Sequence, residues 1–292
     1  MKKVVTPATS ANLGPGFDIL GLALCLYNTF SFAYCNEYQL VNFQECYNNK
    51  ENLIIKSYEY VLNCEKVPVV PLYIEQEANI PISRGLGSSS SLIIAGVKIA
   101  NEVLNRRLSK EKLLYYATIL EGHPDNVAPC LYGGLVACKI IDSNKSIINK
   151  YQVDKSLKFL LFIPEYELKT AKAREVLPKE FTLKDIANNY RNLLILLKGL
   201  ESGDETLLKT GIEDFIHTKY RKNLIKDYEL LSTLLDKYTI CHTISGAGPT
   251  VIAITKTYKK ELFSKAKELH FTPLELNIDN KGAFIYEWLY NN

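Results

Sequence analysis

Residues 81–92, "PISRGLGSSSSL", place two glycines and four consecutive serines directly before the apolar run "LIIAGVKIA". Glycine lets the backbone adopt left-handed conformations and approach a ligand closely. The serines would begin a helix, whose first N–H groups have no partner within the helix and favour an anion. Because the helix is apolar nearly all round, we expect it to be buried and its first turn to be fixed. The stretch therefore predicts a phosphate site at a rigid helix start.

The same residues also fit a plain serine-capped helix after a glycine turn, because serine is a favoured N-cap. A flexible linker is less favoured, since an apolar helix follows at once. Two common nucleotide motifs are excluded. The stretch lacks the lysine of G-x-x-x-x-G-K-[ST], and Ser90 stands where G-x-G-x-x-G needs its third glycine. The loop by itself leaves both the phosphate site and the plain cap open.

The composition indicates a large globular protein. The 292 residues are 47% hydrophobic, which is enough for the core of one big domain or two modest ones. The net charge is +3 without a basic block, so nucleic-acid binding has no support. No apolar run reaches the roughly 20 residues of a membrane span, and the N-terminus lacks the apolar stretch of a signal peptide. We therefore expect a cytoplasmic protein without a nucleic-acid or membrane partner.

The cysteines and histidines show no metal or disulfide pattern. The seven cysteines contain no C-x-x-C pair, and the four histidines form no H-E-x-x-H and no close ligand pair. We expect reduced thiols and no dedicated site for a transition metal.

Strand and helix patterns occur in both halves of the chain, which predicts an α+β protein of two domains. The polar segment 142–156 predicts a break, so we place the domains at residues 1–153 and 154–292. In the second domain, residues 205–221 have a helical pattern and residues 282–290 read as a final strand.

Four motifs together resemble those of the GHMP kinases, the superfamily of galactokinase and of homoserine, mevalonate and phosphomevalonate kinases. Residues 81–91 resemble its P-x-x-x-G-L-G-S-S motif, and residues 245–254, "SGAGPTVIAI", resemble its third motif. Residues 7–24, "PATSANLGPGFDILGLAL", and 121–134, "EGHPDNVAPCLYGG", are similar to the first and middle motifs of the homoserine kinases in particular. We expect the third motif to be a glycine-rich wall beside the serine loop.

The resemblance implies the two-domain GHMP fold. Its N-terminal domain is ribosomal-protein-like, with a left-handed β-α-β unit that departs from the usual hand. Its C-terminal domain is ferredoxin-like. ATP and the acceptor would meet in the cleft between the domains, and the family often forms homodimers.

In these kinases the serine loop surrounds the phosphates of ATP, and backbone amides replace the missing lysine. The resemblance assigns Mg²⁺ to the Ser89 hydroxyl and the Glu121 carboxylate, which suffice because Mg²⁺ completes its shell with phosphate oxygens and water. It places ATP on Pro81, Ile82, Ser83, Arg84, Gly85, Leu86, Gly87, Ser88, Ser89, Ser90 and Ser91.

The resemblance places the acceptor between two arginines and a carboxylate. Arg174 in "KTAKAREVLP" and Arg221 in "HTKYR" would bind its carboxylate through charge-assisted hydrogen bonds. Asp18 would pair with its ammonium group. The implied substrate-binding residues are Asn12, Asp18, His123, Arg174 and Arg221, and the implied catalytic residues are Asp18, Asn126 and Thr170.

The implied reaction moves the γ-phosphoryl group of ATP to the hydroxyl of L-homoserine and gives O-phospho-L-homoserine and ADP, a step of threonine biosynthesis. Phosphoryl transfer has a loose transition state, so positioning and charge stabilisation carry most of the catalysis. Asp18 could therefore accept the proton or only orient the substrate. The alternatives are a kinase for another small alcohol, of the mevalonate or shikimate type, and a non-catalytic binding protein on the same fold.

Overall fold

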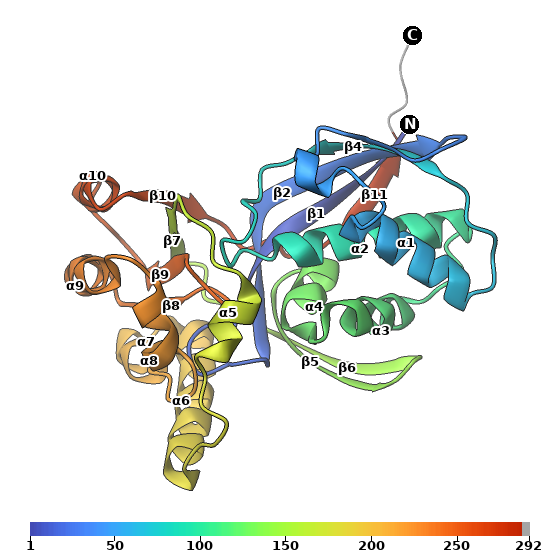
Figure 1. Cartoon of the computed structure of the whole chain (residues 1–292). Coiled ribbons are helices and arrows are strands. Elements are labelled where there is room, and N and C mark those ends of the chain that lie inside the picture. Colours follow the sequence, from blue (N-terminus) through green and yellow to red (C-terminus); the bar gives the residue numbers. More distant parts are fainter. Residues whose placement is uncertain (288–292) are drawn as a thin grey trace.

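A seven-stranded and a four-stranded β-sheet organise the chain into two neighbouring units (Figure 1). The computed structural model describes residues 1–287. Within them, no helix combines the length and the apolar character that crossing a bilayer requires. Both units contain helices and strands, which confirms the predicted α+β class.

The first sheet runs in the order β11-β1-β2-β4-β3, and β5 joins it at β2 with β6 as its hairpin partner. Four helices pack on it, and two of them, α2 and α4, contact β1 directly. The strands are β1 (Lys2–Ala11), β2 (Leu20–Tyr34), β3 (Gln39–Val41), β4 (Leu72–Glu77), β5 (Leu135–Asp142), β6 (Lys145–Tyr151) and β11 (Phe284–Glu287). The helices are α1 (Leu53–Cys64), α2 (Ser88–Val103), α3 (Lys110–Glu121) and α4 (Pro124–Tyr132), with a 3-10 turn, Glu45–Tyr47, before α1.

The second sheet is antiparallel throughout, in the order β10-β7-β9-β8. Its strands follow one another as β-α-β-β-α-β, the connectivity of a ferredoxin-like unit. The strands are β7 (Lys158–Pro164), β8 (Cys241–Ile244), β9 (Val251–Thr255) and β10 (Phe271–Leu276). The helices are α5 (Thr170–Glu175), α6 (Leu183–Ser202), α7 (Glu205–Gly211), α8 (Thr218–Arg221), α9 (Tyr228–Tyr238) and α10 (Glu261–Glu268), with a 3-10 turn, Lys222–Leu224, after α8.

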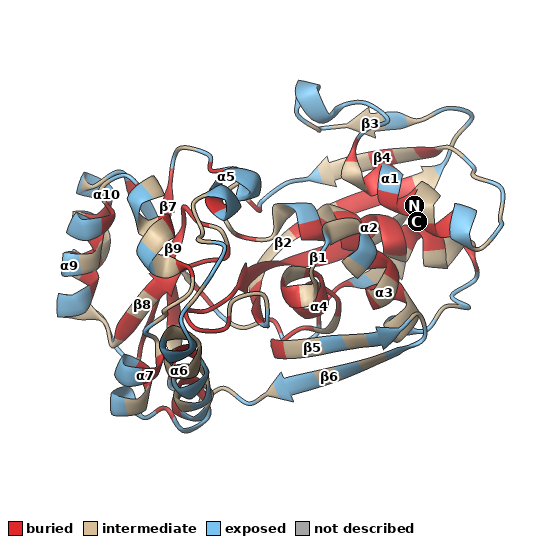
Figure 2. Cartoon of the chain, turned by 60° about the horizontal axis from the view of Figure 1, so that its bottom comes forward, coloured by how far each residue is buried: buried red, intermediate tan, exposed pale blue. Residues whose placement is uncertain are grey.

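Strand β7 is buried on both faces, as its continuous apolar run requires. Alternate side chains of a strand point to opposite faces. Phe159 and Leu161 join the cluster that contains residues of α6 and α7, whereas Leu160 and Phe162 join the cluster with residues of α9 and α10. Figure 2 shows this buried sheet between helices whose outer faces are exposed.

The predicted buried helix after the serine loop is α2. Most of its apolar residues are buried, and it packs against β1 and α1. At Gly96 a Cβ atom would lie 2.3 Å from the carbonyl oxygen of Ile54 in α1, so the two helices are in direct backbone contact. The first turn of α2 is therefore fixed, as the sequence predicts.

Two local predictions are wrong. Residues 145–151, expected within a polar break, form strand β6, where Ile148 packs toward the core and Ile147 is exposed. Residues 205–221 form two helices instead of one. Helix α7 ends at Gly211, whose Cβ position is 2.4 Å from the backbone nitrogen of Leu196, and a turn follows.

The final strand returns to the first sheet. β11 pairs antiparallel with β1, from Lys2 opposite Glu287 to Val5 opposite Phe284. The predicted second domain, 154–292, includes this strand, although its pairing lies in the first sheet. The boundary at residue 153 stays a prediction, and residues 288–290 of the predicted strand lie outside the described residues.

Candidate active site

A cavity of about 650 Å³ is lined by residues of both units, including residues from all four sequence motifs. Most of the residues predicted to bind ATP, Mg²⁺ or the acceptor line it. Leu86, Ser90 and Ser91 are buried and are not among the lining residues. The lining therefore groups residues that lie far apart in the sequence, from Ala11 to Ala247.

The serine loop begins α2 with glycines in left-handed conformations. Gly87 has a φ of 69° and is the N-cap, and a Cβ atom there would lie 1.9 Å from Oγ1 of Thr9. Gly85 has a φ of 73°, and its Cβ position is 2.4 Å from the carbonyl oxygen of Ser245. Both positions require glycine because conformation and space exclude a side chain. The loop is pressed between β1 and the third motif.

The third motif forms the wall that we expected. The Ser245 hydroxyl donates to the carbonyl oxygen of Gly85 at 2.7 Å. The Gly246 N–H donates to Ala11 at 3.0 Å, and the Gly246 carbonyl accepts from Asn12 Nδ2 at 2.8 Å. The wall therefore connects the serine loop of the first unit to the end of β1.

The serines of the loop have different partners. The hydroxyls of Ser89 and Ser90 both donate to Oε1 of Glu121, at 2.8 and 2.7 Å. Ser91 Oγ lies 2.7 Å from Thr6 Oγ1 in the core. Ser89 and Glu121 thus present a hydroxyl and a carboxylate at one point of the cavity, which is the kind of oxygen donor set that suits Mg²⁺.

Arg84 anchors the loop through its side chain. Its guanidinium donates to the carbonyl oxygens of Ile82 at 2.9 Å and Pro164 at 3.0 Å, and also to that of Glu165. Pro164 is the last residue of β7, so this side chain connects the loop to the second sheet. Anion binding at the loop is consequently left to its backbone N–H groups.

Asp18 and Arg174 form a two-pronged ion pair, with N–O distances of 2.8 and 3.1 Å. This hydrogen bonding raises the pKa of Arg174 above its usual value. Asp18 has a φ of 55°, and its N–H donates to Oδ1 of Asn12 at 3.0 Å. The family resemblance assigns Asp18 to the ammonium group of the acceptor and Arg174 to its carboxylate, and in the structure these two side chains bind each other.

Arg221 is a buried cation, only 2% exposed. Its Nε donates to Ala173 at 3.1 Å and its Nη1 to Gly246 at 3.0 Å, both backbone carbonyls. Burial first, and then the charge of Arg174, lowers its pKa to about 10, so it stays charged at neutral pH. The ring of Phe17 lies 5.2 Å from Arg221 and 5.7 Å from Arg174. The arrangement suits an anion, because two cations lie against one aromatic ring.

The residues at the start of α4 add further polar side chains to the site. His123 Nδ1 contacts Oδ1 of Asp125, which is buried, and this hydrogen bond raises the pKa of the imidazole. Polar atoms of Asp18, His123 and Asp125 lie within 4.8 Å of one another. Asn126 accepts from the Thr9 hydroxyl at 2.7 Å. The cluster places two carboxylates, Asp18 and Asp125, close to the two arginines.

Sequence reasoning missed several residues of this site. Phe17 and Asp125 each stand next to a residue that was singled out, Asp18 or Asn126, and that adjacency was the available signal. No motif marked another part of the lining, which consists of Asn42, Phe43, Tyr47, Asn52, Gln76 and Asn79. Thr170, which was singled out, is the first residue of α5 and lines the cavity.

Comparisons with known proteins agree on one family. The family described as GHMP kinases N terminal domain matches residues 52–134. A homoserine kinase of Clostridium beijerinckii is 40% identical over 98% of this chain and 99% of its own length, and one of Clostridium botulinum is 39% identical over 98% of both. The crystal structure of homoserine kinase from Cytophaga hutchinsonii superposes with a TM-score of 0.83 at 25% identity, over 97% of this chain and 96% of that one.

Proposed function

Because the chain belongs to the homoserine kinase family of GHMP kinases, we propose that its cavity holds ATP at the serine loop and L-homoserine between the two arginines. The activity is ATP-dependent phosphorylation of homoserine, which gives O-phospho-L-homoserine and ADP. One observation carries the assignment of the site. A fixed helix start with glycines in left-handed conformations and a buried arginine line the same cavity.

The loop of residues 81–91 binds the phosphates of ATP. The N–H groups at the start of α2 and the helix dipole favour negative charge, and α2 is held by its packing on β1. The buried members Leu86, Ser90 and Ser91 contribute through the backbone or by shaping the loop. The lining around Tyr47, Asn52 and Asn79 receives the nucleoside end.

Ser89 and Glu121 hold Mg²⁺. The donor chemistry fits, because a hydroxyl and a carboxylate converge within 2.8 Å at the phosphate end of the cavity. When bound, the ion neutralises charge on the phosphate oxygens. Glu121 is the last residue of α3, directly before the C-cap Gly122. Its carboxylate accepts hydrogen bonds from the hydroxyls of Ser89 and Ser90, which position it for the ion.

We expect the acceptor to bind both members of the ion pair between Asp18 and Arg174. Its carboxylate takes Arg174 and Arg221, its ammonium group takes Asp18, and the Asp18–Arg174 pair of the free protein opens. Directional hydrogen bonds from two guanidiniums fix the carboxylate. Asn12, His123 and Asn126 orient the rest of the substrate, and Thr170 lies near the transferred phosphoryl group.

Transfer is direct and in line, with the helix start stabilising the developing charge. Asp18 orients the hydroxyl and the ammonium group, and a strong base is not required by a loose transition state. The predicted domain boundary at residue 153 and the predicted homodimer stay predictions; sedimentation of the purified protein measures the second.

We expect Asp18→Asn to raise the KM for homoserine about tenfold, because the neutral amide loses the charge-assisted pairing with the ammonium group. We expect kcat to fall by less than about tenfold, since removal of an essential base costs at least about a hundredfold. Initial rates of ADP formation over a homoserine series separate the two constants. Asp204→Asn, in an acid that caps α7, is the control. A loss of kcat beyond about a hundredfold at saturating homoserine would show that Asp18 is the base.

The substrate assignment is tested by incubating the protein with ATP, Mg²⁺ and one of homoserine, mevalonate, shikimate or serine. We expect homoserine to give the fastest ADP formation, because it alone of the four combines a carboxylate, an ammonium group and a terminal hydroxyl on a four-carbon chain. ADP at background level with homoserine, or a faster rate with mevalonate or shikimate, contradicts the proposal.

A further inference from the structure

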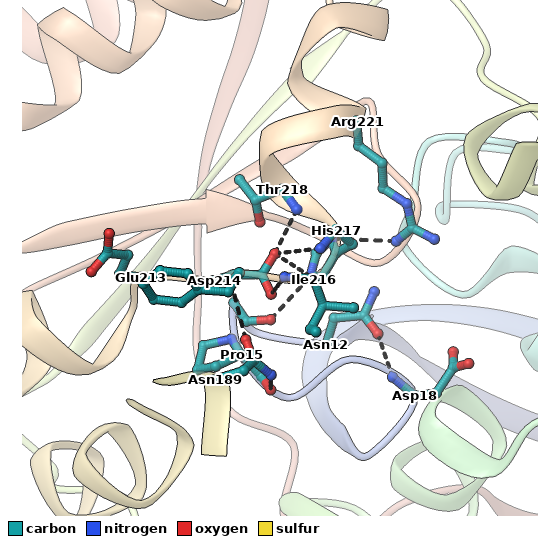
Figure 3. Close-up of polar contacts among 12 residues, drawn as sticks. Asn12, Pro15, Asp18, Asn189, Glu213, Asp214, Ile216, His217, Thr218 and Arg221 are labelled. Carbon is teal, nitrogen blue, oxygen red and sulfur yellow. Dashed lines mark hydrogen bonds and ion pairs between the residues drawn. The ribbon is translucent and has the colours of Figure 1, made fainter. Parts of the chain in front are cut away.

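The turn between α7 and α8 contacts the first motif and Arg221 through His217 (Figure 3). The Asp214 carboxylate, 1% exposed, accepts from the backbone N–H groups of Ile216 at 2.9 Å, His217 at 2.8 Å, and Thr218. These bonds begin α8 and turn the ring of His217 into the interior, where its side chain is 0% exposed. No function proposed above uses this buried imidazole, and its contacts indicate a role.

The two ring nitrogens of His217 face groups of opposite character. Nε2 lies 3.0 Å from the carbonyl oxygen of Gly14 and 3.5 Å from Oδ2 of Asp214, and Nδ1 lies 3.4 Å from Nη1 of Arg221. A carbonyl can only accept a hydrogen bond and a guanidinium can only donate one. The ring must therefore carry its proton on Nε2 and present a lone pair on Nδ1, which is the neutral form. Burial lowers the pKa of His217, in agreement with a neutral ring.

We propose that His217 is a positioning residue that orients Arg221 toward the acceptor. The inference rests on the carboxylate-binding role proposed for Arg221. Three acceptors fix this guanidinium: the carbonyls of Ala173 and Gly246 and the Nδ1 lone pair of His217. Among the described residues its Nη2 has no protein partner in the structure, and Arg221 lines the cavity. These contacts use three of the five N–H groups and leave the two on Nη2 for a carboxylate.

The imidazole of His217 also contacts the first motif. Its Nε2 donates to Gly14, four residues before Asp18 in the first motif. The ring of Phe17 lies 5.4 Å from it. A charged imidazole would place a third cation beside Arg174 and Arg221, whereas the neutral ring supplies an acceptor. The position therefore suits a side chain with one donor and one acceptor at opposite ends.

Two substitutions separate these contacts. In His217→Gln the terminal amide reaches the Nε2 position and can still donate to Gly14, but the acceptor at Nδ1 is lost. In His217→Asn the shorter amide places an oxygen near the Nδ1 position and keeps an acceptor for Arg221. We expect His217→Gln to raise the KM for homoserine about tenfold, with kcat within about threefold and the KM for ATP unchanged. We expect His217→Asn to recover most of this loss.

The control is Asn189→Ala, which removes hydrogen bonds to the carbonyl oxygen of Pro15 at 2.8 Å and from the N–H of Phe215 at 3.1 Å. It therefore disturbs the same loop and the turn that carries His217, without contacting Arg221. If Asn189→Ala raises the KM for homoserine as much as His217→Gln does, or if the two His217 variants are equal, His217 has only a structural role. Arg221→Lys tests the premise separately. An unchanged KM in that variant would remove the proposed role of Arg221 and this inference with it.

A measurement on the unmodified protein covers the case in which a variant does not fold. Nitrogen-15 NMR of histidine-labelled protein distinguishes protonated from unprotonated ring nitrogens. We expect a histidine with a protonated Nε2 and an unprotonated Nδ1 at neutral pH, and the contacts of its ring protons with the Phe17 ring, 5.4 Å away, assign it in the unmodified protein. A doubly protonated ring, or a proton on Nδ1, overturns the proposal.

Discussion

Gly87→Ala is expected to lower kcat/KM for ATP by about a hundredfold or more, as displacement of binding groups by about 1 Å can do. Alanine in the left-handed conformation costs roughly 1–2 kcal/mol, and its Cβ would lie 1.9 Å from Oγ1 of Thr9. The loop must therefore shift, and the N–H groups at the start of α2 shift with it. Steady-state rates over an ATP series measure the effect.

Gly203→Ala is the matched control. Gly203 ends α6 with a φ of 68°, close to the 69° of Gly87, so the backbone strain is similar. Its Cβ would lie 3.0 Å from the side chain of Asp154, which is partly exposed and can move aside. We expect this variant to lose some stability and to keep its kinetic constants. If both variants have the same kcat/KM for ATP, the fixed geometry of the loop is not required for catalysis.

Glu121→Gln is expected to lower kcat about a hundredfold and to raise the Mg²⁺ concentration needed for half-maximal rate, as loss of a charged metal ligand does. The amide has nearly the same shape, and its oxygen can still accept from the hydroxyls of Ser89 and Ser90. The change therefore removes charge more than structure. Rates over a Mg²⁺ series, together with equilibrium binding of Mn²⁺ in the presence of ADP, measure both effects.

Glu111→Gln provides the comparison, because Glu111 lies in the first turn of the same helix, α3. It removes one carboxylate from that helix at the end remote from the cavity. We expect its Mg²⁺ dependence to match that of the unmodified protein. An unaltered Mg²⁺ dependence of Glu121→Gln would assign the ion to other groups.

The sequence predicted the parts of the fold that local patterns control. The apolar residues of α2 and the glycines before it predict a buried helix with a fixed start, and the structure has both. The split of residues 205–221 was missed, because it depends on Gly211 meeting the distant α6 and on the capping by Asp214. Long-range packing and side-chain capping leave little trace in hydrophobic periodicity.

For the candidate site too, local motifs predicted a part, and contacts between distant segments were missed. Motifs predicted many of the residues that line the cavity, including Asp18, Arg174 and Arg221. They did not predict that Asp18 and Arg174 bind each other, or that Arg221 is buried against the carbonyls of Ala173 and Gly246. Those contacts join segments more than a hundred residues apart or depend on backbone atoms, and a motif describes neither.

The pairing of β11 with β1 has a consequence for synthesis on the ribosome. Strand β1 contains Lys2 and is made first, yet its partner along one edge ends at Glu287 (Figure 1). At about 5–20 residues per second, that edge stays open for many seconds while the rest of the chain is made. An open strand edge can pair with another chain. The nascent protein therefore depends on β11, or on a chaperone, to protect the strand that packs against its own phosphate loop.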